Sequence, residues 1–408
     1  MTAALSKPWL VMPNQRPVSQ VTVIGAGIAG AATAHAFAKQ GIPVRVLEQN
    51  SIASGASGNH QGLLYAKISA ADTPQNQLLQ LAYPFVLQQL QADFPAADFW
   101  HSCGLLQVAF NAQEAQRQHK LLQQPHPDFT LWQQQNPDLA AALPAAQGLW
   151  WPQGAWVSPP LWIKTMLQHP LIRVHEQDAV THLQAAENAW RVHTAAGHVH
   201  NSSHVIICNG AAADGFAQTA HLHLRRIRGQ VAYAQAQDSA LNAAITAAHY
   251  ITPAFQGLHT FGASFVFNDD STEFRPTEHQ HNLDGLAALL PDMAQAFAQQ
   301  APQGRASVRA DSIDHLPVVG PVGRADEMRE LYAKLALDRN YPLQAACPYW
   351  EGLWVNCAHG TRGMLTAPLS AYHLTKQILE QKTVLSQSLQ DCLHPNRLLI
   401  RQLIYANA

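Results

Sequence analysis

VTVIGAGIAG, at residues 21–30, runs from an apolar, β-branched segment directly into a glycine-rich turn. The Ala-rich segment AATAHAFAKQG at 31–41 follows, and it has the composition of a buried helix that stops at a glycine. Residues 43–47, PVRVL, predict a second strand, which Glu48 closes. A strand, a glycine turn, a helix, a second strand and an acid in this order indicate a Rossmann-like dinucleotide-binding fold.

Each part of this unit has a physical role in binding a dinucleotide. Gly25 permits the tight turn, Gly27 lets the backbone approach a pyrophosphate, and Gly30 allows the helix to pack closely on the strand. The N-terminus of the helix offers N–H groups and the positive end of its dipole to phosphates. Glu48 follows at roughly the 20-residue spacing expected of the acid that accepts hydrogen bonds from ribose hydroxyls.

Two further segments favour FAD over NAD as the dinucleotide. Residues 54–62, SGASGNHQG, form a polar loop of small residues, which suits the close approach of a bulky flat ligand. A second glycine turn with an arginine, HGTRG at 359–363, follows a predicted strand at 352–357. An NAD-binding domain is usually one early block, whereas FAD is long enough to need walls from distant segments.

The order of these segments predicts an α/β chain, α+β overall. A discontinuous Rossmann-like FAD-binding domain would carry an inserted antiparallel-sheet substrate domain, because residues 225–234 and 249–267 alternate apolar and polar side chains. Residues 1–19 are expected to be a leader or linker. The expected domain segments are 20–95, 160–224 and 305–408 for the FAD-binding domain, and 96–159 and 225–304 for the substrate domain. Helices are predicted at 74–101, 283–300 and 369–380, with surface helices within 112–147.

Composition and charge exclude several classes of protein. Of the 408 residues, 47% are hydrophobic, which is enough for a sizeable core, and the formal net charge of −2 excludes a globally basic nucleic-acid binder. The 22 histidines are expected mainly on the surface, which would become cationic below about pH 6.5. The five cysteines form no CxxC pair, so neither a metal site nor a disulfide is expected. With no signal peptide and no membrane-length apolar run, a cytoplasmic protein is expected.

Several stretches carry a resemblance to a known family. The start, VTVIGAGIAGAATAHAFAKQG, resembles the FAD-binding start of the D-amino-acid oxidase and glycine oxidase superfamily. More specific stretches resemble the FAD-dependent oxidoreductase domain of the MnmC family of bifunctional tRNA-modifying proteins, over about residues 8–405. These stretches are GASGNHQGLLYAKIS at 55–69, WPQGAWVSPPLW at 151–162, VRADSIDHLPVVG at 308–320, YWEGLWVNCAHGTRGMLTAPLSAYHL at 349–374 and HPNRLLIRQL at 394–403.

The chain departs from that family at its start. The bifunctional proteins carry an N-terminal methyltransferase, for which this sequence has no room, and Lys7-Pro8-Trp9 resembles the linker that would follow it. We therefore expect either a stand-alone oxidoreductase or a fragment expressed alone.

The resemblance implies an FAD-dependent oxidoreductase that acts on a CH–NH bond. It would remove the carboxymethyl group from 5-carboxymethylaminomethyl-(2-thio)uridine at the tRNA wobble position, giving 5-aminomethyl-(2-thio)uridine and glyoxylate. The implied partners are tRNA, molecular oxygen as electron acceptor and a separate methyltransferase that acts next, with no membrane. A glycine- or sarcosine-type amine oxidase with the same fold stays open as an alternative, as does a non-catalytic flavoprotein that only binds RNA or a partner.

Three residues are predicted to act on the substrate or at the flavin. By resemblance, Arg309 binds the substrate carboxylate, for which the planar fork of arginine is well suited. Arg362 is predicted at the flavin edge, and Tyr250 resembles a substrate-pocket tyrosine of glycine oxidase. The ordinary alternatives are a surface ion pair, an arginine that faces solvent at a helix start, and a packed strand tyrosine.

The other predicted site residues contact the cofactor. Val180 resembles the residue whose backbone pairs with the adenine, and an ordinary strand valine is the alternative. The predicted cofactor-binding residues are Gly25, Gly27, Ile28, Ala29, Gly30, Glu48, Gln49, Ala56, Ser57, Asn59, Gln61, Gly62, Leu63, Val180, Asn209, Gly210, Gly360, Arg362, Gly363, Met364 and Leu365.

A basic run suggests where RNA would bind. Arg225, Arg226 and Arg228 form the densest group of cations, and Lys67, Arg397 and Arg401 are scattered additions. Such a patch predicts salt-sensitive, sequence-tolerant phosphate binding, and a solvated strand edge is the alternative.

Overall fold

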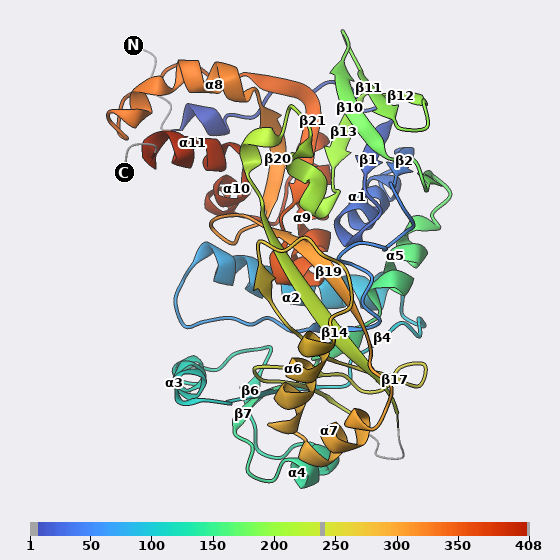
Figure 1. Cartoon of the computed structure of the whole chain (residues 1–408). Coiled ribbons are helices and arrows are strands. Elements are labelled where there is room, and N and C mark those ends of the chain that lie inside the picture. The colour runs from blue at the N-terminus through green and yellow to red at the C-terminus, as the bar shows by residue number, and fades with distance from the viewer. Residues whose placement is uncertain (1–6, 237–240, 406–408) are drawn as a thin grey trace. The chain divides into compact units, whose positions relative to one another are not determined.

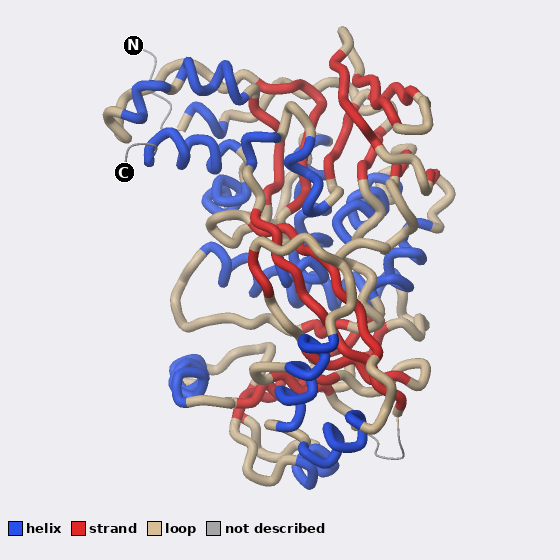
Figure 2. Tube along the Cα trace, in the orientation of Figure 1, coloured by secondary structure: helices blue, strands red, loops and turns tan. Residues whose placement is uncertain are grey.

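The computed structural model describes residues 7–236 and 241–405, so the first six residues of the predicted leader lie outside the described part. Contacts between residues divide the chain into two units, whose helices and strands are traced in Figures 1 and 2. The first unit comprises Met1–Gly55, Ile163–Arg225 and Arg309–Ala408, and the second comprises Ala56–Trp162 and Arg226–Val308.

These units differ from the predicted domains mainly at residues 56–95, which were expected in the FAD-binding domain. In the structure β3 (Gly62–Leu64) pairs antiparallel with β8 (Ala155–Val157), and β4 (Trp100–His101) pairs with β8 on its other edge. This small sheet joins the segment after Gly55 to the second unit.

The first unit is built on a six-stranded sheet with the order β20-β21-β13-β1-β2-β9. All neighbouring pairs are parallel except β20 and β21. The side chains of β1 are all buried, which explains why its sequence is a continuous apolar run rather than an alternating one. The strands are β1 (Val21–Ile24), β2 (Val44–Leu47), β9 (Ile172–His175), β13 (His204–Ile207), β20 (Val318–Gly323) and β21 (Tyr349–Cys357).

Two helices pack against each other beside this sheet, as Figure 1 shows for α1 and α9. Helix α1 (Ile28–Ala38) is buried along almost its whole length, because its alanines allow close approach from several sides. Helix α9 (Gly363–Ile378) follows the second glycine turn, so the predicted helix at 369–380 starts earlier than expected. The other helical elements of this unit are η1 (Pro8–Leu10), η2 (Gly210–Gly215), η3 (Ala220–Leu222), α8 (Ala325–Leu331), η4 (Ala333–Ala336), η5 (Gly360–Arg362), α10 (Gln387–Leu393) and α11 (Asn396–Tyr405). Helix α5 (Pro159–Leu167) spans the boundary at Ile163.

A separate antiparallel sheet in the first unit consists of β10 (Val180–Ala185), β11 (Trp190–Thr194) and β12 (Val199–Ser202). Trp190 and Val192 of β11 point into a core that they share with Val205 and Ile207 of β13.

The second unit contains a larger, mostly antiparallel sheet. Its central strands β14 (Arg225–Gln235) and β17 (Leu258–Gly262) pair antiparallel, which confirms the strands expected from the alternating pattern. Phe261 and Ile251 pack on one face with Leu283 and Phe297 of two helices. The other strands are β5 (Leu105–Val108), β6 (Thr130–Leu131), β7 (Gly148–Trp151), β15 (Ala244–Thr246), β16 (Tyr250–Ile251) and β18 (Val266–Phe267). Strand β19 (Gln303–Asp311) pairs with β14 and spans the boundary between the units at Arg309.

The helices of this unit differ from the prediction in two places, each time because of proline. The helix predicted at 283–300 is two helices, α6 (Pro276–Ala287) and α7 (Pro291–Ala298), since Pro291 starts a new one. Helix α2 (Pro74–Asp93) ends before Pro95 rather than at residue 101. Within 112–147 two helices form, as predicted: α3 (Ala112–Leu121) and α4 (Pro137–Ala142), separated by a segment with Pro125 and Pro127.

Among the residues that the structure describes, none of the helices combines the length and apolar character that a membrane crossing requires.

Candidate cofactor site

The first glycine turn lies between β1 and α1, at the carboxyl ends of the parallel strands. Gly25 has φ +101°, and its N–H donates to the Leu47 carbonyl at 2.8 Å. A Cβ on Gly30 would lie 1.8 Å from the Gly25 carbonyl oxygen, so only glycine allows α1 to start this close to the strand. The turn thus has the tight geometry that was predicted for a pyrophosphate-binding loop.

The N-terminus of α1 is suited to an anion. Its N-cap residue is Gly27, and no side chain caps the helix. Ile28, Ala29 and Gly30 form the first turn, where backbone N–H groups and the helix dipole favour negative charge. The predicted phosphate-binding residues are therefore adjacent at one helix start.

Glu48 lies at the end of β2, next to this turn. Its side chain accepts from the Ala26 N–H at 2.7 Å through Oε2 and from the Asn50 N–H at 2.9 Å through Oε1. An ionised carboxylate has about four lone-pair positions, so two remain for ribose hydroxyls. Gln49, which follows it, is exposed.

The end of β13 forms another wall of the same turn. A Cβ on Gly25 would lie 2.8 Å from Cα of Asn209, so the two backbones touch. The Oδ1 atom of Asn209 is buried without a hydrogen-bond partner among the described residues, while its Nδ2 donates to the Ala212 carbonyl at 3.3 Å. A buried acceptor of this kind beside a glycine cradle fits a ligand that brings its own donor. Gly210 follows with φ +59°.

The second glycine turn is tied to the first helix by a chain of hydrogen bonds. Burial lowers the pKa of His359 to about 3, so its ring is neutral. Its Nε2 lies 3.0 Å from Oδ1 of Asn356, which can only accept, so Nε2 carries the proton. Asn356 in turn donates to Oγ1 of Thr33 in α1 at 3.0 Å.

Neither Asn356 nor Thr33 was predicted to belong to the site. The sequence feature that could have indicated Asn356 is its place as a polar residue within the apolar strand GLWVNC, because a buried amide needs hydrogen-bond partners. Gly363, at the start of α9, lies beside the first turn, since a Cβ on it would approach Cγ2 of Ile28 at 3.4 Å.

Arg362 and Arg309 lie on two segments of the first unit that meet. Asp311, two residues after Arg309, forms an antiparallel bridge with His359, three residues before Arg362. Both arginines are half-buried. Gly360 lies in the turn between His359 and Arg362 and adopts φ +55°. Met364 and Leu365 lie in the first turn of α9.

Val180 begins β10 in the first unit and pairs with Thr194. Its side chain is partly buried and packs against the same core as β13. The pairing of the Val180 backbone with an adenine stays a prediction.

The predicted cofactor residues from the 54–62 loop belong to the second unit. Gln61 is fully buried, its Nε2 donates to the Pro253 carbonyl at 3.0 Å, and its Oε1 accepts from Thr252 at 2.9 Å. Asn59 accepts from Nη1 of Arg305 at 3.5 Å. Ala56, Ser57, Gly62 and Leu63 lie on the same segment.

Tyr250 lies in β16 of the second unit and pairs with Gly262, which pairs in turn with Val231 of β14. Paired residues share a face, so Tyr250 lies on the same face as Tyr233, two residues after Val231. The hydroxyl of Tyr233 accepts from the His60 N–H at 3.2 Å. Tyr233 was not predicted from the sequence, although it belongs to the alternating pattern at 225–234.

The basic run at 225–228 is not a continuous cationic surface, which corrects that interpretation. Arg228 is 0% exposed and donates to Glu278 at 2.8 Å. Arg226 pairs with Asp270 at 3.5 Å, and of the three arginines only Arg225 is exposed. Arg397, another predicted addition, forms a two-pronged pair with Asp314 at 2.8 and 2.9 Å.

A family model and curated relatives both match nearly the whole of this chain. The family model described as FAD dependent oxidoreductase matches residues 20–377. The chain is 35% identical to the "tRNA 5-methylaminomethyl-2-thiouridine biosynthesis bifunctional protein MnmC" of Chromobacterium violaceum, and 37% identical to that of Pseudomonas putida strain W619. Each alignment covers 98% of this chain and 63% of the relative, so the chain spans less than two thirds of these relatives' length.

Two solved structures show the same fold. Glycine oxidase from Geobacillus kaustophilus superposes with a TM-score of 0.73 at 20% identity, over 93% of this chain and 99% of that one. The fructosamine oxidase of Aspergillus fumigatus superposes with a TM-score of 0.74 at 14% identity, over 94% and 91% respectively.

Proposed function

This chain belongs to the family of FAD dependent oxidoreductases, and from this premise we propose that it removes the carboxymethyl group from 5-carboxymethylaminomethyl-(2-thio)uridine in tRNA. The products would be 5-aminomethyl-(2-thio)uridine and glyoxylate. The observation that carries the proposal is the 35–37% identity, over 98% of the chain, to proteins named for tRNA 5-methylaminomethyl-2-thiouridine biosynthesis.

The residues of the first unit fit FAD. Gly25 and Gly30 let α1 start close to the end of β1, which gives the tight turn of a pyrophosphate-binding loop. Glu48 keeps two acceptor positions, and the buried Oδ1 of Asn209 lacks a partner among the described residues. When bound, FAD supplies the acceptor for a hydride from the CH₂ between the amine and the carboxylate of the substrate.

The protein's own task is to hold the substrate so that this CH₂ is aligned. In our proposal Arg309 binds the carboxylate with two parallel N–H groups, and Tyr250 lines the substrate pocket. Arg362 and the first N–H groups of α9 stabilise negative charge at the flavin edge. The bridge between Asp311 and His359 supports this assignment, because it fixes the strand of Arg309 against the second turn.

The overall reaction needs two co-reactants and leads to a further step. Water supplies the aldehyde oxygen of glyoxylate, and molecular oxygen takes the two electrons and two protons to give peroxide. The freed primary amine would be the substrate of a methyltransferase that acts next.

The test is anaerobic mixing of the purified holoprotein with tRNA that carries the carboxymethylaminomethyl group, followed by flavin absorbance. We expect rapid bleaching and one glyoxylate per flavin, with no bleaching by the same tRNA lacking the modification. Bleaching by free glycine or sarcosine but not by the modified tRNA would replace the proposal by a small-molecule amine oxidase. No bleaching by any of them would contradict both.

A further inference from the structure

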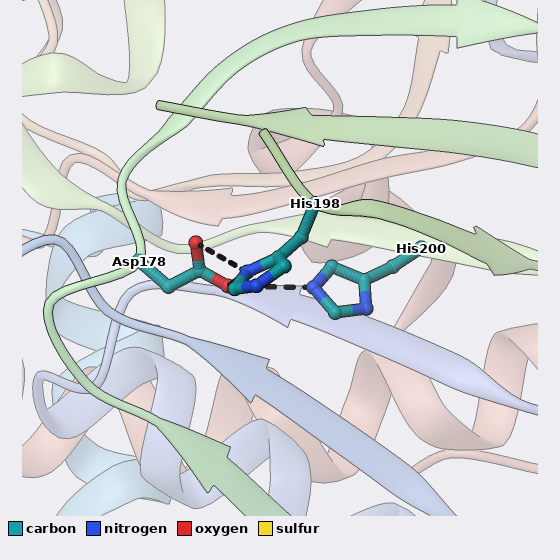
Figure 3. Close-up of side chains that lie close together, drawn as sticks. All are labelled: Asp178, His198 and His200. Atoms are coloured by element: carbon teal, nitrogen blue, oxygen red, sulfur yellow. Dashed lines mark hydrogen bonds and ion pairs between the residues drawn. The ribbon is translucent and has the colours of Figure 1, made fainter. Parts of the chain in front are cut away.

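Three side chains outside the cofactor site converge in the first unit. Asp178 lies in the loop before β10, His198 lies in the turn before β12, and His200 lies within β12. The two histidines are two residues apart, and side chains at that spacing along extended chain point to the same side. Figure 3 shows both imidazole rings directed at the carboxylate of Asp178.

The distances have the values that a tetrahedral ion needs. Nδ1 of His198 and Nε2 of His200 each lie 3.3 Å from Oδ2 of Asp178, and the ligand atoms of the three residues all lie within 4.8 Å of one another. For bonds of about 2.0–2.1 Å to zinc, neighbouring ligands in a tetrahedron are about 3.3–3.4 Å apart. The two distances from Oδ2 of Asp178 to the histidine nitrogens therefore already match those between neighbouring zinc ligands.

Charge and burial also favour a cation. The side chain of Asp178 is 6% exposed and that of His200 is 15% exposed, and Asp178 forms its ion pairs with these two histidines. Imidazole nitrogens and carboxylate oxygens both offer lone pairs to a metal ion, so the three residues can act together as ligands. The side chain of His198 is 62% exposed, which gives an ion and a water ligand access from solvent.

The loop that carries Asp178 is joined to the cofactor site. The N–H of Asp178 donates to the Glu48 carbonyl at 2.9 Å, and the N–H of Gln177 donates to the Asn50 carbonyl at 2.9 Å. An ion held by Asp178 and β12 would thus fix the backbone on both sides of the acid at the end of β2.

We propose that Asp178, His198 and His200 bind one zinc-class divalent transition-metal ion, with water as the fourth ligand. Two imidazoles and one carboxylate favour zinc, cobalt or nickel over magnesium, which prefers six oxygen ligands. The role is structural, since the ion braces the loop at 177–178 against the turn at Glu48. The inference does not depend on which substrate the enzyme oxidises.

The first test counts bound zinc. Untagged holoprotein is stripped with a chelator and dialysed against micromolar zinc, and the metal is measured per chain. We expect the wild type to retain one zinc more than the His198→Gln/His200→Gln double variant. The matched control is His182→Gln/His193→Gln, whose rings stack at 4.0 Å and hydrogen-bond to Thr181 and Gln184 rather than to a carboxylate. This control should bind as much zinc as the wild type.

A second measurement keeps the proposal falsifiable if the double variant folds poorly. The single variant His198→Gln changes an exposed side chain and should fold normally. Zinc should raise the Tm of the wild type, magnesium should not, and neither ion should raise the Tm of His198→Gln. Equal zinc content in the wild type and the double variant, or an equal zinc-dependent rise in Tm in His198→Gln, would overturn the assignment.

Discussion

Arg228 donates from Nε to Oε1 of Glu278 at 2.8 Å, inside the second unit, with the arginine side chain fully buried. Its Nη2 also donates to the Glu273 carbonyl at 2.7 Å and to Oε1 of Gln230 at 3.1 Å. The guanidinium therefore joins β14 to the segment before α6 and to α6 itself. With a further bond from Nη1 to the Ser271 carbonyl, four of its five N–H groups donate within the protein, and its full burial keeps it from a phosphate in solution.

We predict that Arg228→Ala destabilises the protein by about 3–5 kcal/mol, because it leaves the carboxylate of Glu278 without its cation in a buried place. The exposed neighbour Arg225 is the matched control, and Arg225→Ala should change the free energy of unfolding by less than about 0.5 kcal/mol. Urea unfolding followed by fluorescence measures both. Equal unfolding midpoints for the two variants would show that the buried pair contributes little.

Because Arg228 is buried, only Arg225 and Arg226 of the basic run can contact the phosphates of tRNA. Their double replacement by alanine should lower the slope of log K for tRNA binding against log salt by about one for each phosphate that the arginines neutralise. Replacement of the exposed Lys382 in the first unit serves as the control and should leave the slope unchanged. If the double variant has the wild-type slope, tRNA binds along a different surface.

The sequence predicted the first glycine turn well, because each requirement is local. Gly25, Gly30 and Glu48 lie within one strand–helix–strand unit, and short-range geometry determines what they contact. It could not predict that Arg228 is buried while Arg225 is exposed, because that depends on Glu278, fifty residues later in the chain. The same holds for Asn356 and Thr33, which meet only when β21 packs beside α1.

Most histidines are at least partly exposed, as the composition suggested, but several are buried in the first unit, which the composition could not indicate. A residue that is mostly neutral at pH 7 can be buried at moderate cost, so its frequency alone does not determine where it lies. The sequence did not predict that Asp178, His198 and His200 lie together, because their approach depends on how the loop before β10 meets β12.

Gly30→Ala should abolish FAD binding. The added Cβ would lie 1.8 Å from the Gly25 carbonyl, so α1 must move away from β1 and the turn must open. The wild type should purify yellow and release its flavin on acid precipitation, because attachment is expected to be non-covalent. Gly215→Ala, where a Cβ meets nothing within 4 Å, is the control and should stay yellow. A yellow Gly30→Ala protein with wild-type FAD affinity would contradict the prediction.

The first unit should lose stability as the pH falls from about 6.5 to about 4. Burial lowers the pKa of five histidines below the ordinary 6.5, to about 4 for His204, His221 and His373 and to about 3 for His359 and His394. In this window the unfolded chain binds more protons than the folded one, so the free energy of unfolding falls with falling pH. Each such group contributes a slope of at most about 1.4 kcal/mol per pH unit.

Tm and FAD release, measured between pH 7.5 and 4, check this pH dependence. His221→Phe removes one group that must stay neutral, and it should move the acid midpoint to lower pH. His119→Gln changes an exposed histidine of the second unit and should not move it. A Tm that stays constant down to pH 4.5 would mean that these histidines do not govern acid stability.

Arg309→Ala should retain FAD and lose most of its rate of flavin reduction. The carboxylate is the only fixed charge of the proposed substrate next to the reacting CH₂, so the residue that binds it also aligns the C–H bond. Loss of hydrogen bonds to a charged group costs about 1.5–3 kcal/mol, and loss of alignment adds to this, giving about a hundredfold or more in kcat/KM. Arg309→Lys should recover only part of the rate of flavin reduction, because an ammonium cannot make the two-pronged contact.

Arg305 is the matched control, since it lies four residues earlier in β19, on the same face of the strand, and donates to Asn59. Stopped-flow reduction by modified tRNA should leave Arg305→Ala within about tenfold of the wild type. The reverse pattern, with Arg305→Ala slow and Arg309→Ala fast, would assign the carboxylate to Arg305 instead.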